Sequence, residues 1–175
     1  MKKNAATKMR DALIEAALPH VPFDGWAWKV LETAADDYGT QPAMARAVFP
    51  GGISDVLDGF ADLADRRMLA RLEKIAAHDL KTRERIRVAV MARFGVLQEC
   101  REAERLALAY WAVPLRGMKA ARIVWRTADR IWDWAGDTAT DYNRYTKRGL
   151  LSGVLGASTL AWLDDDSPDM GITDA

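Results

Sequence analysis

The sequence predicts an all-α protein, and three observations support this fold class. Apolar residues recur at spacings of three and four along most of the chain. Prolines and glycines fall between those segments, and no alternating strand pattern persists. The chain has 175 residues and 50% of them are hydrophobic, so it can bury a substantial core as one domain or as a small lobe joined to a larger one.

The N-terminal part predicts three short helices followed by a long one. We expect helices over residues 7–18, 26–38 and 42–48, because Pro19 and Gly39 end the first two and Thr40 can cap the third. Ser54 can cap the fourth, which runs to about residue 77. These proportions are typical of a helix-turn-helix lobe followed by a connector helix.

Four further helices complete the prediction. Thr82 can cap the first of them. Its apolar face carries Ile86, Val90, Phe94 and Leu97, at spacings of four, four and three. The others are expected over residues 103–112, 115–135 and 141–163.

The helix-turn-helix proportions raise the alternative of a ligand-responsive transcription regulator of the TetR type. Residues 42–48, PAMARAV, would be its recognition helix, and Arg46 is their only charge. Residues 1–75 contain ten basic and eleven acidic residues, so this lobe lacks the positive charge that phosphate contacts require. We therefore expect no DNA binding. A structural dimer with a filled core and no ligand is a third interpretation.

Residues 115–135 form the clearest amphipathic segment. One predicted face is apolar and holds Met118, Ala121, Val124, Trp125, Ala128, Ile131, Trp132 and Ala135. The opposite face is basic and holds Arg116, Lys119, Arg122, Arg126 and Arg130. Two interpretations stay open for the basic face, namely a solvated helix side or a surface for anionic lipid or an acidic partner.

Residues 150–163 carry no charge, and at fourteen residues they are shorter than the roughly 20 that span a bilayer. An uncharged helix is expected to be covered on all sides, by core, partner subunit or lipid. Matching helical phase predicts one apolar interior, which could hold a lipid. It would be lined by Phe94, Leu97, Trp125, Trp132, Leu151, Val154 and Leu155.

Catalytic chemistry finds little support in the residue supply. His20 and His78 lie far apart, and no Zn²⁺, nucleophile-elbow, Walker, dinucleotide or Glu-x-x-His motif occurs. The run of three aspartates at residues 164–166 is interpreted as a solvated helix end. We expect no catalytic residue, metal or cofactor. The single cysteine, Cys100, and the absence of a recognisable signal peptide predict a cytoplasmic protein.

Three segments carry a family resemblance. LIEAALPHVPFDGWAWKVLETAADDYG opens with a Leu-Pro, Val-Pro, Gly-Trp pattern, and FPGGISDVLDGFADLADRRMLARLE follows it. The C-terminal block contains Trp132, Ala135-Gly136-Asp137, Thr140-Asp141, Asn143, Tyr145-Thr146, Arg148 and Asp166-Ser167-Pro168-Asp169. Together they resemble the accessory lipid-binding family of ubiquinone (coenzyme Q) biosynthesis, whose fold is like that of TetR regulators.

The resemblance implies a non-enzymatic homodimer that binds a lipid or isoprenoid quinone intermediate and presents it to the demethoxyubiquinone hydroxylase. Residues 1–52 would be the helix-turn-helix-like lobe, without DNA-binding chemistry, and residues 53–175 the helical lipid-binding and dimerisation region. The hydroxylase surface would map onto Ile131, Asp141, Asn143, Arg144, Tyr145 and Arg148.

The chain departs from the family pattern in two places. Arg144 stands where the family usually has tryptophan, which is a typical interface anchor. The family also continues past Ser-Pro-Asp into an amphipathic helix that meets the membrane, whereas this sequence reads MGITDA. Peripheral contact with the inner face of the cell membrane is therefore expected either to depend on the basic face of residues 115–135 or to be weak.

Overall fold

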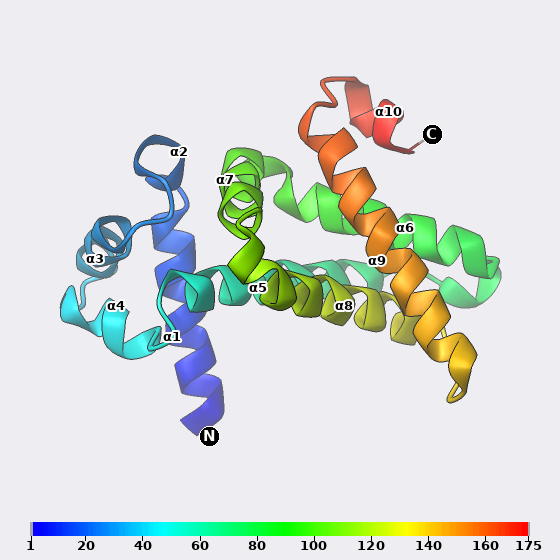
Figure 1. The fold of residues 1–175 in the computed structure, drawn as a ribbon, viewed down its shortest axis with the longest axis horizontal. Coiled ribbons are helices and arrows are strands. Elements are labelled where there is room, and N and C mark those ends of the chain that lie inside the picture. Colours follow the sequence, from blue (N-terminus) through cyan, green and yellow to red (C-terminus); the bar gives the residue numbers. More distant parts are fainter. Residues whose placement is uncertain (1, 175) are drawn as a thin grey trace. The chain divides into compact units, whose positions relative to one another are not determined.

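The structure is a computed structural model that describes residues 2–174, with side chains from residue 5 onward (Figure 1). Every regular element within residues 2–174 is helical, and no strand occurs among them. The all-α prediction is confirmed. By packing, the chain forms two compact units: unit 1 extends to Leu63 and includes Cys100–Ala112, and unit 2 comprises Ala64–Glu99 and the chain from Val113 onward. The lobe boundary expected at residue 52 lies before Leu63, where the packing divides α5 between the two units.

Helix α5, Ile53–Leu72, contributes its first half to unit 1 and its second half to unit 2. It ends before the expected residue 77, because Ala76 has a non-helical ψ of 79°. Ser54 does not cap it but lies within its first turn, where its hydroxyl donates to the Gly51 carbonyl at 3.1 Å.

Unit 1 contains the predicted short helices and one that was not predicted. Its other elements are α1 (Lys2–Ala17), α2 (Val21–Asp24), α3 (Trp28–Asp37), α4 (Ala43–Val48) and α7 (Arg101–Trp111). The unpredicted α2 has Pro22 in its first turn and ends at Gly25, whose φ of 70° favours glycine.

The core of unit 1 forms where α1 packs against α3 and α4. Buried Leu13 and Ile14 of α1 face this core, and Arg10 reaches along its edge. The Arg10 guanidinium pairs with Asp55 at 2.7 Å, donates to the Val48 carbonyl at 2.9 Å and lies over the Phe49 ring. These contacts fix α1, α4 and the start of α5 within unit 1.

Unit 2 contains α6 (Thr82–Leu97), α8 (Gly117–Trp134), α9 (Tyr142–Leu163) and α10 (Gly171–Asp174). Short 3₁₀ turns precede or follow them: η1 (Ala77–Asp79), η2 (Gln98–Cys100), η3 (Pro114–Arg116) and η4 (Pro168–Met170). The N-cap position of α6 is Lys81 and not Thr82, and the Glu84 carboxylate accepts from the Lys81 backbone N–H at 2.9 Å. On α6, the predicted apolar face is buried at Val90, Phe94 and Leu97 and half-buried at Ile86.

An aromatic stack joins α6 to α9 in the core of unit 2. The rings of Phe94 and Trp162 lie nearly parallel, with centroids 5.2 Å apart. The Trp162 indole N–H donates to the Gln98 side-chain oxygen at 2.9 Å, so this fully buried ring keeps its polar group satisfied. The stack holds the C-terminal half of α9 against the end of α6.

A buried carboxylate, Asp65 of α5, organises the packing of α5, α6 and α8. It accepts from Thr127 at 2.9 Å and pairs with Arg93 and Arg130 at 3.1 Å each. Arg126 lies 4.0 Å away. Because a buried charge is costly unless it is paired, these contacts from two helices, α6 and α8, allow Asp65 to be fully enclosed.

The Asp65 contacts correct the predicted faces of α8. Arg126 and Arg130 were expected on a basic face but turn toward Asp65. Met118, expected on the core face, is exposed, whereas Ile123 and Thr127 are buried. The buried face is therefore rotated toward the basic side, because one buried carboxylate attracts two arginines inward.

The aspartate run after α9 is not a simple solvated helix end. Asp164 and Asp166 are exposed, but Asp165 is buried and accepts from Ser167 and Thr173. Bonds from the Ser167 hydroxyl and from the hydroxyl and backbone of Thr173 hold the pKa of Asp165 well below its ordinary value. Asp165 thus fixes the turn that leads into α10.

Candidate functional site

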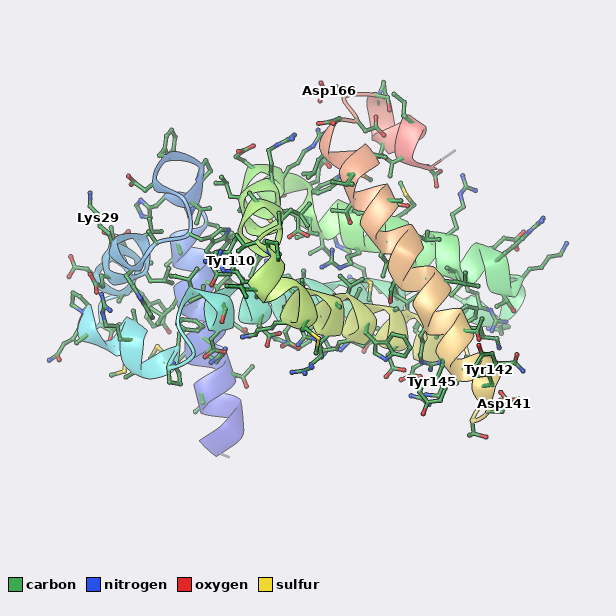
Figure 2. The ribbon with its side chains drawn as sticks, in the orientation of Figure 1. Lys29, Tyr110, Asp141, Tyr142, Tyr145 and Asp166 are labelled. Atoms are coloured by element: carbon green, nitrogen blue, oxygen red, sulfur yellow. The ribbon has the colours of Figure 1, made fainter. Side chains whose placement is uncertain are left out.

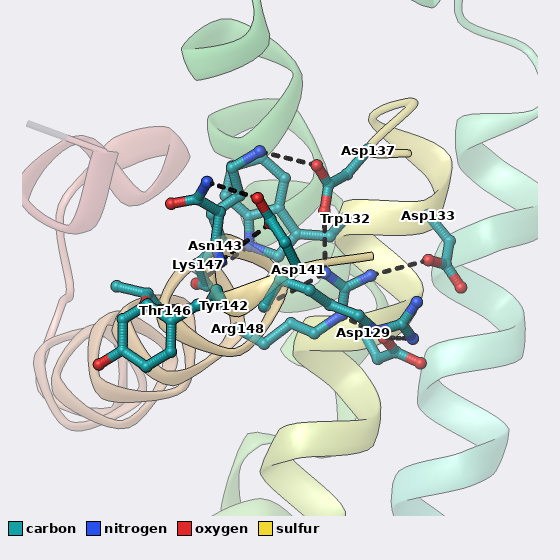
Figure 3. A network of polar contacts seen from close by, with 11 residues as sticks. Asp129, Trp132, Asp133, Asp137, Asp141, Tyr142, Asn143, Thr146, Lys147 and Arg148 are labelled. Carbon is teal, nitrogen blue, oxygen red and sulfur yellow. Dashed lines mark hydrogen bonds and ion pairs between the residues drawn. The ribbon is translucent and has the colours of Figure 1, made fainter. Parts of the chain in front are cut away.

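Three aspartates line the side of α8 and its C-terminal turn that faces α9. Asp129, Asp133 and Asp137 are spaced four residues apart, so they fall on one side of the helix. The guanidinium of Arg148 lies among them, as Figure 3 shows. It pairs with Asp133 at 3.0 Å, with Asp137 at 2.9 Å and also with Asp129. The side chain of Arg148 has no exposed surface.

Two neighbouring bases of α9 complete this group, which we call the α8–α9 ion-pair cluster. Arg144 pairs with Asp129 at 3.0 Å and Lys147 with Asp137 at 2.7 Å. The cluster therefore balances three acids against three bases, and consists of Asp129, Asp133, Asp137, Arg144, Lys147 and Arg148.

The pairing of Asp137 with Arg148 is ionised at neutral pH. Hydrogen bonds from Lys147 and then Arg148 lower the pKa of Asp137 to about 2. Burial alone would lower the pKa of Arg148, but its hydrogen bonds to Asp129 and Asp137 outweigh burial and raise it. The favourable pairing is thus present at physiological pH. It weakens only as pH falls from the ordinary carboxyl range toward 2, where Asp137 takes up a proton.

The first turns of α9 present aromatic side chains to solvent. Tyr142 is 82% exposed and Tyr145 is 63% exposed, and both project from the end of the helix beside Asp141 in Figure 2. Asp141 caps α9, accepting from the backbone and side-chain nitrogens of Asn143 at 3.1 Å each. The capped helix start is therefore rigidly positioned, and its two tyrosines lie three residues apart on one face.

The half-buried ring of Trp125 supports this aromatic surface from α8. Its centroid lies 6.4 Å from that of Tyr145. Gly149 of α9 lies next to the ring, because a Cβ built there would make an ordinary van der Waals contact with Trp125 at 3.9 Å. Tyr142, Tyr145 and Trp125 together make an aromatic patch at the start of α9.

The structure separates the residues predicted to bind the hydroxylase. Asp141, Asn143 and Tyr145 are exposed, and Arg144 is half-buried against Asp129. Ile131 and Arg148 are completely buried, so the prediction that they contribute to a surface patch is wrong. Ile131 belongs to the core face of α8, and Arg148 is enclosed by the aspartates.

Sequence reasoning missed Tyr142 and the role of the three aspartates. The spacing of four between the aspartates, ahead of a helix start rich in bases, was a signal that could have identified the cluster.

The predicted lipid-lining residues also fall into groups. Phe94, Leu97, Leu151 and Leu155 are buried, and Trp125 and Trp132 are half-buried beside the first turns of α9. The Trp132 indole donates to the Lys147 carbonyl at 3.1 Å. Val154 is 51% exposed, so its expected place in the interior is wrong. It lies on the exposed flank of α9, beside the buried side that contains Leu151 and Leu155.

The outer side of α9 is apolar and exposed among the residues that the structure describes. Large side chains there alternate with small residues. The exposed positions are Gly149, Leu150, Gly153, Val154, Gly156, Ala157, Leu160 and Ala161. The expectation that the uncharged segment is covered on all sides holds within the chain only for the side that contains Leu151, Leu155 and Trp162.

The single charged residue of the expected recognition helix, α4, is paired with other residues of unit 1. Arg46 pairs with Glu32 at 2.9 Å and lies over the Trp28 ring at 4.6 Å. A guanidinium held by a carboxylate and an aromatic face is a poor phosphate ligand.

Two features are absent from residues 2–174. None of the helices there combines the length and the apolar character needed to cross a bilayer. No group of histidine, cysteine and acidic side chains in that range is arranged to hold a metal ion.

Comparison with known proteins supports the C-terminal resemblance. The family model described as COQ9 matches residues 118–175. The ubiquinone biosynthesis protein COQ9, mitochondrial, of Rattus norvegicus is 28% identical over 93% of this chain and 54% of its own length. The protein of the same name from Homo sapiens is 27% identical over 93% of this chain and 53% of its own. The chain thus spans about half the length of these curated relatives.

A solved structure supports the fold. A TetR transcriptional regulator from Nitrosomonas europaea matches with a TM-score of 0.75, covering 95% of this chain and 92% of its own, at 21% identity. The predicted TetR-like fold and the resemblance to the ubiquinone-biosynthesis family are confirmed. The curated names place those relatives in mitochondria, so the cytoplasmic location expected for this chain stays a prediction.

The first prediction concerns the buried guanidinium. Arg148→Met should lower the free energy of unfolding by about 3–5 kcal/mol, because three facing aspartates lose their central partner. Urea unfolding at neutral pH measures this. Arg148→Lys is the matched control and should lose less, since it keeps the charge but cannot reach three carboxylates at once. A native-like midpoint for Arg148→Met would contradict the structural role of the cluster.

Proposed function

We propose that this chain, which is similar to the COQ9 proteins, is a non-enzymatic accessory protein of ubiquinone biosynthesis that binds an isoprenoid lipid. The observation that carries the proposal is the match to curated relatives named for ubiquinone biosynthesis over 93% of the chain. The uncharged segment of α9 and the apolar interior between α6 and α9 suit an apolar ligand.

The regulator alternative has no observation that favours it. The structural likeness to a TetR regulator extends to the fold, and fold alone does not carry function. In unit 1, Arg46 is held by Glu32 and Trp28 and is the only charge on α4. We therefore expect no salt-dependent shift of promoter DNA at near-physiological salt, and such a shift, abolished by Arg46→Ala, would restore the regulator.

The second prediction tests the lipid. Mass spectrometry of organic extracts from the purified chain should detect an isoprenoid or other apolar lipid. Leu155→Trp adds volume to the buried side of α9 and should displace it, at a cost of about 1–3 kcal/mol in stability. The matched control is Leu115→Trp, because Leu115 is almost fully exposed and its replacement should leave the extract unchanged.

Absence of any lipid from the native extract would reject the lipid-binding proposal and favour the structural dimer with a filled core. Thermal unfolding of both tryptophan variants shows whether lost lipid reflects a blocked interior or an unfolded chain.

We further propose that the aromatic patch at the start of α9 contacts the demethoxyubiquinone hydroxylase. Exposed tyrosines on a rigid helix start are typical of interface anchors. The patch keeps Asp141, Asn143 and Tyr145 at the surface and adds Tyr142, whereas Ile131 and Arg148 support it from below.

The third prediction tests this contact. Tyr145→Ala should weaken binding to the cognate hydroxylase by about 30-fold, which is the loss expected for a central anchor. Surface plasmon resonance measures the affinity. Tyr38→Ala, at an exposed tyrosine of unit 1, is the control and should bind normally. Unchanged binding by Tyr145→Ala, or its unfolding, would reject the contact. Tighter binding by Arg144→Trp would show that the family's anchor is missing here.

The outer side of α9 supports the proposed homodimer. Its exposed glycines and alanines allow close approach of a second helix, and Leu150, Val154 and Leu160 offer apolar area around them. An apolar surface of this kind in water favours association with a second copy.

The fourth prediction tests the dimer. Light scattering after size-exclusion chromatography should give the dimer mass for the native chain and the monomer mass for Gly153→Arg. A Cβ at Gly153 would meet no atom of its own chain within 4 Å, so Gly153→Ala is the matched control. The alanine variant should stay dimeric and gain up to about 1 kcal/mol in helix stability. A native monomer at all concentrations, or a dimeric arginine variant, would reject this interface.

A further inference from the structure

Positive charge in unit 2 is concentrated where α5 ends and α6 begins. Residues 66–87 contain eight lysines and arginines against three acidic residues. The sequence predicted membrane contact through the basic face of α8, and not through this part of the chain. Two bases of that face, Arg126 and Arg130, turn inward to Asp65.

The turn itself exposes both bases and apolar groups. Lys74, Lys81 and Arg83 are exposed, and Ile75 between them is 37% exposed. We call these four residues the basic turn. Figure 2 shows long side chains that end in nitrogen atoms, extending from the N-terminal end of α6 next to the basic turn. The same stretch contains three acids, Glu73, Asp79 and Glu84; Asp79 lies against His78 and Glu84 accepts from the Lys81 backbone, and the wider segment of residues 66–87 keeps an excess of five bases.

We propose that the basic turn contacts the anionic surface of a lipid bilayer, an inference that rests on the proposed lipid-handling function. Lysine and arginine attract anionic headgroups, and an exposed isoleucine among them can enter the boundary between headgroups and acyl chains. Each base close to such a surface increases binding about fivefold, so three bases together give roughly a hundredfold.

Charge complementarity alone would also suit nucleic acid, but two features favour the bilayer. Residues 66–93 contain no phenylalanine, tyrosine or tryptophan on which a base could stack. The basic turn also combines its charges with an exposed isoleucine, which phosphate contacts do not require.

The test is sedimentation of the full chain with vesicles. Vesicles of phosphatidylcholine alone are compared with vesicles in which one lipid in four is phosphatidylserine. The native chain should bind the anionic vesicles and be released by high salt. The triple variant Lys74→Gln, Lys81→Gln, Arg83→Gln should lose roughly a hundredfold in binding at low salt.

The matched control removes the same charge from α8, as Arg116→Gln, Lys119→Gln, Arg122→Gln. It should retain most of the binding. The proposal is overturned if the α8 variant loses binding and the basic-turn variant keeps it, or if native protein binds both kinds of vesicle equally. It is also overturned if the basic turn shifts duplex DNA while the chain ignores vesicles.

Lipid extraction separates this inference from the proposed function. A chain that carries an isoprenoid but does not bind anionic vesicles refutes the basic-turn proposal alone. A chain that binds vesicles through the basic turn but yields no lipid on extraction refutes the proposed function alone. Ile75→Ala should weaken binding at every salt concentration, because its contribution is apolar and not screened.

Discussion

The buried guanidinium of Arg148 is the interaction on which the candidate site depends. It joins α9 to three aspartates on consecutive turns of α8 and its C-terminal extension, so it fixes both the distance and the rotation of the two helices. A buried charge tolerates little displacement, because losing one partner leaves an uncompensated ion. The position of Tyr145 at the surface and of Leu151 in the core both follow from this rotation of α9.

That rotation divides the uncharged segment of α9, residues 150–163, into two apolar sides. The side with Leu151, Leu155 and Trp162 packs into unit 2, and the side with Gly153 and Val154 faces solvent. Charge is absent from both sides, which is unusual for a helix that meets water on one of them. A second covering element explains this composition better than solvent does, and the small residues allow that element to be another helix.

Much of the fold could be predicted from the sequence because its signals are local. The apolar spacing of α6 and the Asp141 cap of α9 depend on residues within a few turns. The inward orientation of Arg126 and Arg130 could not be predicted, because their partner Asp65 lies on a helix about sixty residues earlier. Arg148 was wrongly predicted at the surface, because a charged side chain is normally exposed. Val154 was wrongly predicted in the interior, because the uncharged segment of α9 gives no sign of which side faces the core.

The two buried charge clusters also determine where free charge remains. The α8–α9 ion-pair cluster balances three acids with three bases, so it contributes almost no net field. Asp65 draws in Arg93, Arg126 and Arg130, which weakens the basic face that α8 would otherwise present. Exposed positive charge is then concentrated at the basic turn, distant in sequence from the aspartates that follow α9. The exposed bases therefore lie outside the apolar interior. In the proposed lipid-binding function this arrangement is favourable, because a charge outside the interior can orient the chain without opposing burial of an apolar ligand.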